Sequence, residues 1–185
     1  MRKAFAFLLA MLLAGGLHHA AHAQPLPQSA SEEAVKAAFL YRFLNYVEWP
    51  PGALPSADAP YVIGVAEDED VADELDSIVA HRKVNNRKII LKRLHDGDSA
   101  SGLQVLFIGR SDRARRAAWI KSIQQQPVLI VTETPGALEQ GSMINFVVVD
   151  QRVRFEASLA AIERARLKVN SRMLAVAVAV QKEVP

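Results

Sequence analysis

Three groups of residues in this sequence have types and spacings that could do chemistry. His18, His19 and His22 have the HHxxH spacing of a metal site. The run EDEDVADELD, 67–76, brings carboxylates together, as general acid–base or calcium sites do. The segment FIGRSD, 107–112, places a glycine and an arginine between a strand and a helix start, where backbone amides can hold an anion. Each group also has a structural interpretation.

The histidine group lies in a segment that we expect to be removed. Basic residues at 2–3 precede an apolar run, 4–17, and an A-x-A pattern follows, and these are the three parts of a secretory signal peptide. The apolar run is too short for a membrane-spanning helix, which needs about 20 residues. We therefore predict cleavage between Ala23 and Gln24, with an uncleaved anchor as the alternative.

Removal of residues 1–23 changes what the composition implies. The two basic residues at the start account for the whole formal charge of +2, so 22 − 2 = 20 basic residues balance 20 acidic ones. This balance gives no reason to expect nucleic acid or an anionic membrane as partner. The chain has no cysteine, which excludes disulfides, a lipid anchor and thiol chemistry. We expect residues 24–30 to be a flexible lead-in and 31–185 to form a single soluble domain, not membrane-spanning.

The acidic run and the FIGRSD segment are each explained by ordinary helix starts. Aspartate and glutamate in a first helical turn complement the helix dipole, and the acidic run lacks the glycine and spacing of a calcium loop. FIGRSD lacks both common phosphate-loop patterns, so a plain strand-to-helix turn is favoured. Gly109, Arg110 and Ser111 remain the candidate residues for an anion or a small ligand.

Nothing in the remaining sequence indicates catalysis. His81 and His95 lie in polar contexts, so neither a zinc site nor a catalytic triad is expected. We predict no catalytic residue, no metal and no cofactor, and favour a binding or regulatory protein over an enzyme. The helix after FIGRSD is strongly basic, which indicates either a solvated face or a partner-binding patch. The arginines of this basic cluster are Arg110, Arg113, Arg115 and Arg116. Of these, we assign Arg113 and Arg116 to partner binding.

The segment AFLYRFLNYVEWPP, 38–51, holds five of the twelve aromatic residues (two Trp, three Tyr and seven Phe). Its pattern predicts a helix that runs to about Trp49 and is stopped by the two prolines. The apolar stripe expected to pack on the sheet contains Phe39, Phe43 and Val47. Residues off this stripe, expected to meet a partner because Tyr and Arg often anchor interfaces, are Tyr41, Arg42 and Asn45. Charged residues and short length argue against membrane insertion.

The middle of the chain alternates apolar strands with helices, which predicts an α/β fold. Because the strands are continuous apolar runs, we expect a single domain with a mostly parallel sheet covered by helices. An antiparallel hairpin is predicted near 147–155, and a last helix after Ser171. The predicted strands are 61–66, 88–94, 103–109, 128–133 and the two strands of the hairpin. The helices predicted between and after these strands end near residues 81, 125 and 169.

Several separated blocks resemble the YfiR family of periplasmic proteins. KAAFLYRFLNYVEWP is similar to the family's opening A-x-x-Y-x-F-x-x-x-x-x-WP helix. A second match is VLIVTETPGALEQGSMINFVVVDQRVRFEASLAAIERARLKVNSRMLAVA. The residues that carry the resemblance are Ala38, Tyr41, Phe43, Trp49, Pro50, Gly136, Gly141, Ile144, Asn145, Phe146, Arg154, Phe155, Glu156 and the stretch 167–174.

The resemblance implies that the protein is a regulator in the periplasm, to which it is secreted by means of the cleaved signal peptide. Such proteins bind the periplasmic sensory part of an inner-membrane diguanylate cyclase and repress it, which lowers cyclic di-GMP and biofilm output. An OmpA-like outer-membrane lipoprotein can sequester the repressor, and a homodimer is a further possibility. Better-known relatives carry cysteine pairs, so their thiol switch is excluded in this chain. The alternative is a periplasmic small-ligand binding protein, with FIGRSD or the loop 134–142 lining its pocket.

Overall fold

The computed structural model describes residues 30–123 and 125–182 of the 185-residue chain. The predicted signal peptide, its cleavage point and nearly all of the lead-in lie outside these residues. The elements in chain order are α1 (Glu32–Phe43), β1 (Val47–Glu48), β2 (Tyr61–Ala66), α2 (Glu69–Val79), β3 (Lys83–Val84), β4 (Arg87–Leu94), β5 (Val105–Ile108), α3 (Arg113–Ser122), β6 (Leu129–Thr132), a 3-10 turn (Leu138–Gln140), β7 (Ile144–Val149), β8 (Arg152–Ser158), α4 (Leu159–Arg164), β9 (Lys168–Val169), α5 (Ser171–Leu174) and β10 (Ala179–Gln181).

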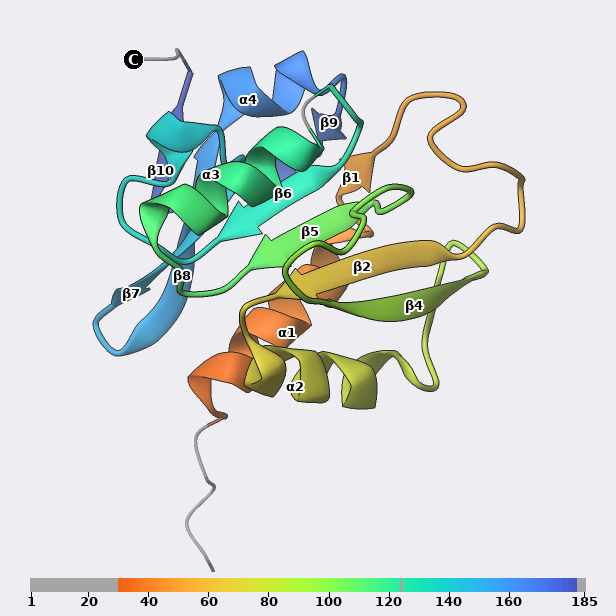
Figure 1. Cartoon of the computed structure of the whole chain (residues 1–185), viewed down its shortest axis with the longest axis horizontal. Coiled ribbons are helices and arrows are strands. Elements are labelled where there is room, and N and C mark those ends of the chain that lie inside the picture. Colours follow the sequence, from red (N-terminus) through yellow and green to blue (C-terminus); the bar gives the residue numbers. More distant parts are fainter. Residues whose placement is uncertain (1–29, 124, 183–185) are drawn as a thin grey trace, which may run out of the picture.

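The main sheet has eight strands in the order β10-β8-β7-β6-β5-β2-β4-β3. Its central strands, from β7 through β4, are all parallel, and antiparallel pairs occur between β7 and β8 and between β3 and β4. Helices α1 and α2 cover one face and α3 and α4 the other (Figure 1). The predicted fold class, a single α/β domain with a mostly parallel sheet and a hairpin, is confirmed.

Local sequence explains the central strands and the starts of the longer helices. The apolar runs that form β2, β5 and β6 are almost entirely buried, as expected for strands covered on both faces. Each longer helix starts at a residue whose side chain accepts a hydrogen bond from a free amide of the first turn. These caps are Ser31 for α1, Asp68 for α2 and Asp112 for α3.

The predicted aromatic helix is too long. Helix α1 ends at Phe43, and the chain then turns into the short strand β1, which pairs antiparallel with β9. Trp49 therefore does not close a helix end. Its ring lies 5.5 Å from that of Tyr61, and its Nε1 donates a hydrogen bond to the carbonyl of Gln104 at 3.2 Å. The tertiary pairing of β1 outweighs the helical pattern of the sequence.

The last predicted helix is also wrong over most of its length. Only Ser171–Leu174 is helical, capped by Asn170, and the chain continues as β10, which lies parallel to β8. The helix predicted up to residue 169 ends instead at Arg164 and is followed by β9. The hairpin is confirmed as β7 and β8, joined by Asp150 and Gln151, both with positive φ.

The aromatic core lies between α1 and the β7–β8 hairpin. Phe43 is buried, as predicted, and its ring contacts those of Phe146 and Phe155. Phe39, one turn earlier in α1, is half-buried, and its ring also contacts those of Phe146 and Phe155. Val47 is buried too, but it reaches the core from β1 and not from a helical stripe.

Candidate functional site

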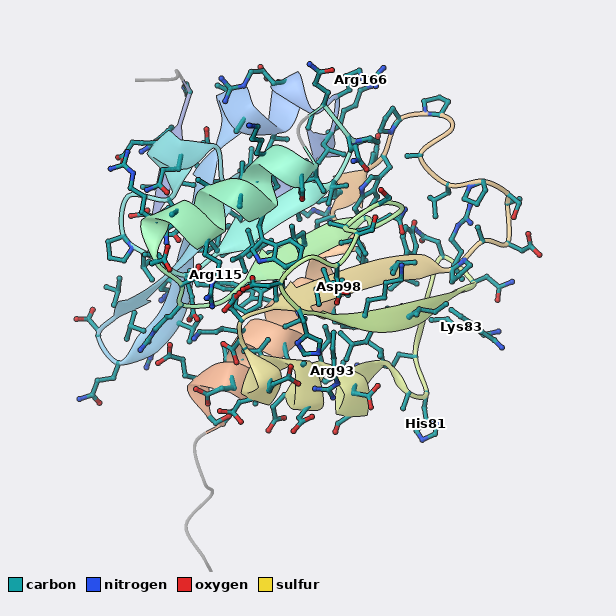
Figure 2. All side chains as sticks on the ribbon, in the orientation of Figure 1. His81, Lys83, Arg93, Asp98, Arg115 and Arg166 are labelled. Atoms are coloured by element: carbon teal, nitrogen blue, oxygen red, sulfur yellow. The ribbon has the colours of Figure 1, made fainter. Side chains whose placement is uncertain are left out.

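The acidic run serves the structure of α2. Asp68 accepts a hydrogen bond from the amide of Val71 at 3.0 Å, and Glu69 and Asp73 each lie 2.7 Å from the guanidinium of Arg93. Figure 2 shows Arg93 beside this helix. These carboxylates therefore have structural partners, which is the interpretation that the sequence favoured.

Within the described residues, no three histidine, aspartate or glutamate side chains gather in a way that could hold a metal ion. His81 lies at the outer end of α2, well separated from Arg115 in Figure 2. Arg115 bridges Glu67 at 3.0 Å and Asp96 at 3.5 Å.

A buried ion pair joins α1 to the carboxyl end of β6. The Nζ of Lys36 donates a hydrogen bond to Oε2 of Glu133, and both side chains are only 4% exposed. The same Nζ lies 2.6 Å from Oε1 of Glu32, one turn earlier in the helix. Arg110, which is 75% exposed, approaches Glu32 at 3.4 Å and Glu133 at 3.9 Å. Two cations and two carboxylates thus form one cluster with no net charge.

The pKa values in this cluster follow from one buried ammonium group shared by two carboxylates. Burial opposes the charge of Lys36, but the hydrogen bonds to Glu133 and Glu32 outweigh it and raise the pKa of the lysine. The hydrogen bond from Lys36 lowers the pKa of Glu32. Burial raises the pKa of Glu133 above its ordinary value, although its bond to Lys36 acts in the opposite direction. As the pH falls, Glu133 therefore takes up a proton before Glu32 does.

The cluster forms the polar side of a pocket of about 440 Å³. Ligands of parallel α/β sheets commonly bind outside the carboxyl ends of the strands, and Arg110 and Glu133 follow β5 and β6 at this edge. The other side of the pocket is largely apolar. Its remaining lining residues are Pro135, Asn145, Phe146, Val147, Val148 and Val153.

Of the predicted anion candidates, only Arg110 lines this pocket. The amide of Gly109 donates to the carbonyl of Ala66 at 2.8 Å, and the carboxylate of Asp112 caps the amides at the start of α3. These donors are thus already used by the protein. The hydroxyl of Ser111 is buried and makes no hydrogen bond within the described residues.

A second concave surface lies between the ends of α1 and α2. It has a volume of about 510 Å³, and the structure brings Tyr41, Arg42 and Asn45 together in its wall. The guanidinium of Arg82 stacks over the ring of Tyr41 at 5.3 Å from its centroid. We call this surface the α1–α2 groove, and its residues are Ala38, Tyr41, Arg42, Asn45, Tyr46, Ile78 and Arg82.

The two arginines assigned to partner binding on α3 have different environments. Arg113 is exposed. Arg116 is buried, where its Nε donates to Gln140 at 3.1 Å and its Nη1 donates to the carbonyl of Ser111 at 2.9 Å. Arg116 therefore anchors two loops and is not part of an accessible patch, which corrects its assignment to a partner surface.

The sequence analysis missed Lys36 and Glu133. A signal was present, because Lys36 precedes Leu40 and Phe43 by four and seven positions and so lies on the buried stripe of α1. A lysine on such a stripe requires a buried partner. The sequence could not identify that partner, since Glu133 is 97 positions away.

Comparisons with known proteins agree with this fold. A crystal structure of a conserved domain protein from Vibrio cholerae O1 biovar El Tor str. N16961 superposes with a TM-score of 0.54 at 12% sequence identity. The match covers 83% of this chain, and this chain spans 61% of the length of that one. Among the described residues, no helix is both long and apolar enough to cross a bilayer.

The family comparison covers most of the chain. A family model described as YfiR/HmsC-like matches residues 33–178, from the first turn of α1 to the residue before β10. That range includes the buried ion pair, the α1–α2 groove and every lining residue of the pocket beside the ion pair except Glu32. The protein therefore belongs to the YfiR/HmsC-like family of periplasmic regulatory proteins.

Proposed function

We propose that this protein is a periplasmic repressor that binds the periplasmic sensory part of an inner-membrane diguanylate cyclase. The match of residues 33–178 to the YfiR/HmsC-like family carries this proposal. The protein is exported by the segment 1–23, which is then removed. It performs no reaction of its own. It acts by preferring the inactive state of the cyclase, because only unequal affinity for two states shifts their equilibrium.

The α1–α2 groove supports this proposal as the contact surface for the cyclase. Its residues have the chemistry of interface anchors, since Tyr41 offers a large amphipathic ring and Arg42 and Arg82 offer planar cations. Arg42 is exposed and Tyr41 is half-buried. The groove therefore fits an acidic surface of the partner. An OmpA-like lipoprotein that binds the repressor would release the cyclase and raise cyclic di-GMP.

The test is the affinity of the 24–185 protein for the periplasmic part of a diguanylate cyclase from the same genome. We expect Tyr41→Ala and Arg42→Ala each to weaken binding by about 30-fold, as truncation of an interface anchor does. Arg42→Ala should not change the unfolding midpoint appreciably, and Tyr41→Ala should lower it far less than the loss of a fully buried core ring does, because Tyr41 is only half-buried. Lys88→Ala is the matched control, because Lys88 is exposed on β4 and lies outside the groove.

Phe43→Ala separates the core from the surface of the same helix. Phe43 is buried in the aromatic cluster, so its truncation should cost about 3–5 kcal/mol of folding free energy. If Phe43→Ala instead keeps the stability of the protein and loses only partner binding, the division of α1 into a core side and a partner side is wrong. If no cyclase fragment binds the wild-type protein, the repressor proposal fails.

A second candidate function is the binding of a small periplasmic molecule. The pocket beside the buried ion pair favours it, because one apolar wall faces a few convergent charged groups. Arg110 of the FIGRSD segment and Pro135 of the loop 134–142 both line this pocket. These are the two segments that the sequence analysis named for a ligand pocket. A compound that raises the melting temperature of the wild-type protein, but not that of Arg110→Ala, would support this candidate.

A further inference from the structure

Strand β8 has an outer edge that its neighbour covers only in part. Strand β10 pairs with β8 at Glu156, Ala157 and Ser158. Just before them, the carbonyl of Phe155 accepts a hydrogen bond from the amide of Val178 at 2.9 Å. From Arg152 to Arg154 no strand within the described residues lies on this side, although β7 pairs along the other side of β8.

The backbone of Val153 faces this open edge. In a strand, the amide and carbonyl groups of alternate residues point toward the same neighbour. Because the carbonyl of Phe155 points outward to Val178, the amide and carbonyl of Val153 point outward as well. Unpaired groups on a sheet edge are a template for an added strand. β8 can therefore accept one.

The two faces of this edge differ in chemistry. On one face, Val153 lies opposite Val148, which is 55% exposed. On the other face, Arg152 and Arg154 are exposed and form no ion pair with any described residue. Beside them lies a groove of about 430 Å³ whose other lining residues are Val149, Asp150, Ala175, Val176, Ala177 and Val178.

The charges select the kind of strand that fits. In an antiparallel pair of two copies centred on Val153, Arg152 of one copy would lie opposite Arg154 of the other. Like charges directly opposite each other destabilise a sheet, so a second copy is a poor occupant. A strand with acidic side chains toward the arginines and apolar side chains toward Val148 and Val153 satisfies both faces.

We propose that the open edge of β8 binds an extended protein segment in which acidic and apolar residues alternate, as an added strand. The main-chain hydrogen bonds of Val153 supply attraction, and the two faces select the sequence. This site goes beyond the proposed repressor function. In Figure 1 the turn between β7 and β8 projects on the left, whereas α2 ends at the right, so a second protein can bind while the α1–α2 groove is occupied.

The probe is a fluorescein-labelled seven-residue peptide of alternating glutamate and valine, with binding measured by fluorescence anisotropy. A rearranged peptide with all glutamates first is the composition control. We expect the alternating peptide to bind at least about tenfold more tightly. Equal affinity for both peptides would overturn the proposal, because unspecific charge attraction would then explain the binding.

Variants of the protein test each source of attraction. Arg152→Glu with Arg154→Glu should weaken binding by at least about tenfold, whereas Lys88→Glu on β4 should have no effect. Val153→Pro removes the outward amide without removing a hairpin hydrogen bond, and it should abolish binding. Unchanged affinity in the arginine variant would contradict the proposal.

Methylation of the backbone nitrogens of the peptide tests the added strand without any change in the protein. We expect the methylated alternating peptide to lose binding, since its side chains remain but its donors do not. Retained binding would show a side-chain contact in place of an added strand. A stable dimer of the free protein that Val153→Pro converts to a monomer would also overturn the proposal, because a second copy would then occupy the edge.

Discussion

At the scale of single residues, Lys36 and Glu133 form an interaction whose value depends on both partners. Each side chain is only 4% exposed, so each charge has lost nearly all contact with water. Their mutual attraction offsets this loss, and removal of one partner leaves the other charge buried with only a more exposed neighbour, Glu32 for Lys36 or Arg110 for Glu133. The pair therefore fixes how α1 docks on the sheet more than it adds stability.

We predict that Lys36→Met destabilises the protein by about 3–5 kcal/mol. The double variant Lys36→Met with Glu133→Leu should recover most of this loss, because no buried charge then remains. Urea denaturation of the two single variants and the double variant gives the coupling free energy directly. Additive losses in the double variant would show that the two side chains act independently.

The pH dependence of the same variants has a defined sign. Burial raises the pKa of Glu133, so the folded state binds its proton more readily than the unfolded state does, and stability from this group grows as the pH falls through that pKa. Loss of Lys36 removes the hydrogen bond and most of the positive charge that oppose this rise in pKa, and leaves only the exposed Arg110 at 3.9 Å from Glu133. The destabilisation by Lys36→Met should therefore be larger at pH 8 than at pH 5. A loss that grows toward pH 5 would contradict the assignment.

At the scale of elements, strands were more predictable than helix ends. The run YVIGVA coincides with β2 because six consecutive apolar residues, five of them buried, carry the strand signal by themselves. The ends of α1 and α5 depended on β1 and β10, whose partners β9 and β8 come from elsewhere in the chain. No local pattern contains such a pairing, so the sequence predicted helices there.

The candidate sites divide in the same way. Tyr41 and Arg42 lie in the last turn of α1 and Asn45 lies in the turn that follows it, so closeness in the sequence was sufficient to group them. The pocket beside Lys36 combines residues from α1, β7, β8 and the ends of β5 and β6. Only the sheet order brings these segments together, which is why sequence spacing identified Arg110 but not the buried pair.

The β7–β8 turn offers a prediction about an element. Asp150 and Gln151 have φ values of 49° and 58°, a region that residues other than glycine occupy at a cost of about 1–2 kcal/mol. Gln151→Gly should stabilise the protein by about 0.5–1 kcal/mol, since glycine relieves this strain but is more flexible when unfolded. Thermal denaturation measures the change. Ala117→Gly, in the exposed middle of α3, is the control and should be destabilising.

At the scale of the whole molecule, the core is one cluster that includes residues from the sheet and from helices on both of its faces. Leu40 of α1 and Trp119 of α3 both belong to it, with β5 and β6 between the layers. Neither helix layer can therefore leave without exposing apolar surface of the sheet. We expect the described part of the chain to unfold in one cooperative step.

The two tryptophans test this expectation, because they report on different parts of the molecule. Trp49 packs against Tyr61 at the start of β2, and Trp119 lies on the buried face of α3. In Trp119→Phe, the fluorescence of Trp49 should follow the same urea transition as the far-ultraviolet circular dichroism of that variant. In Trp49→Phe, the fluorescence of Trp119 should do likewise. An earlier transition at Trp49 would mean that β1 and its surroundings open as a separate unit, and the groove at the end of α1 would then be a surface that partner binding has to order.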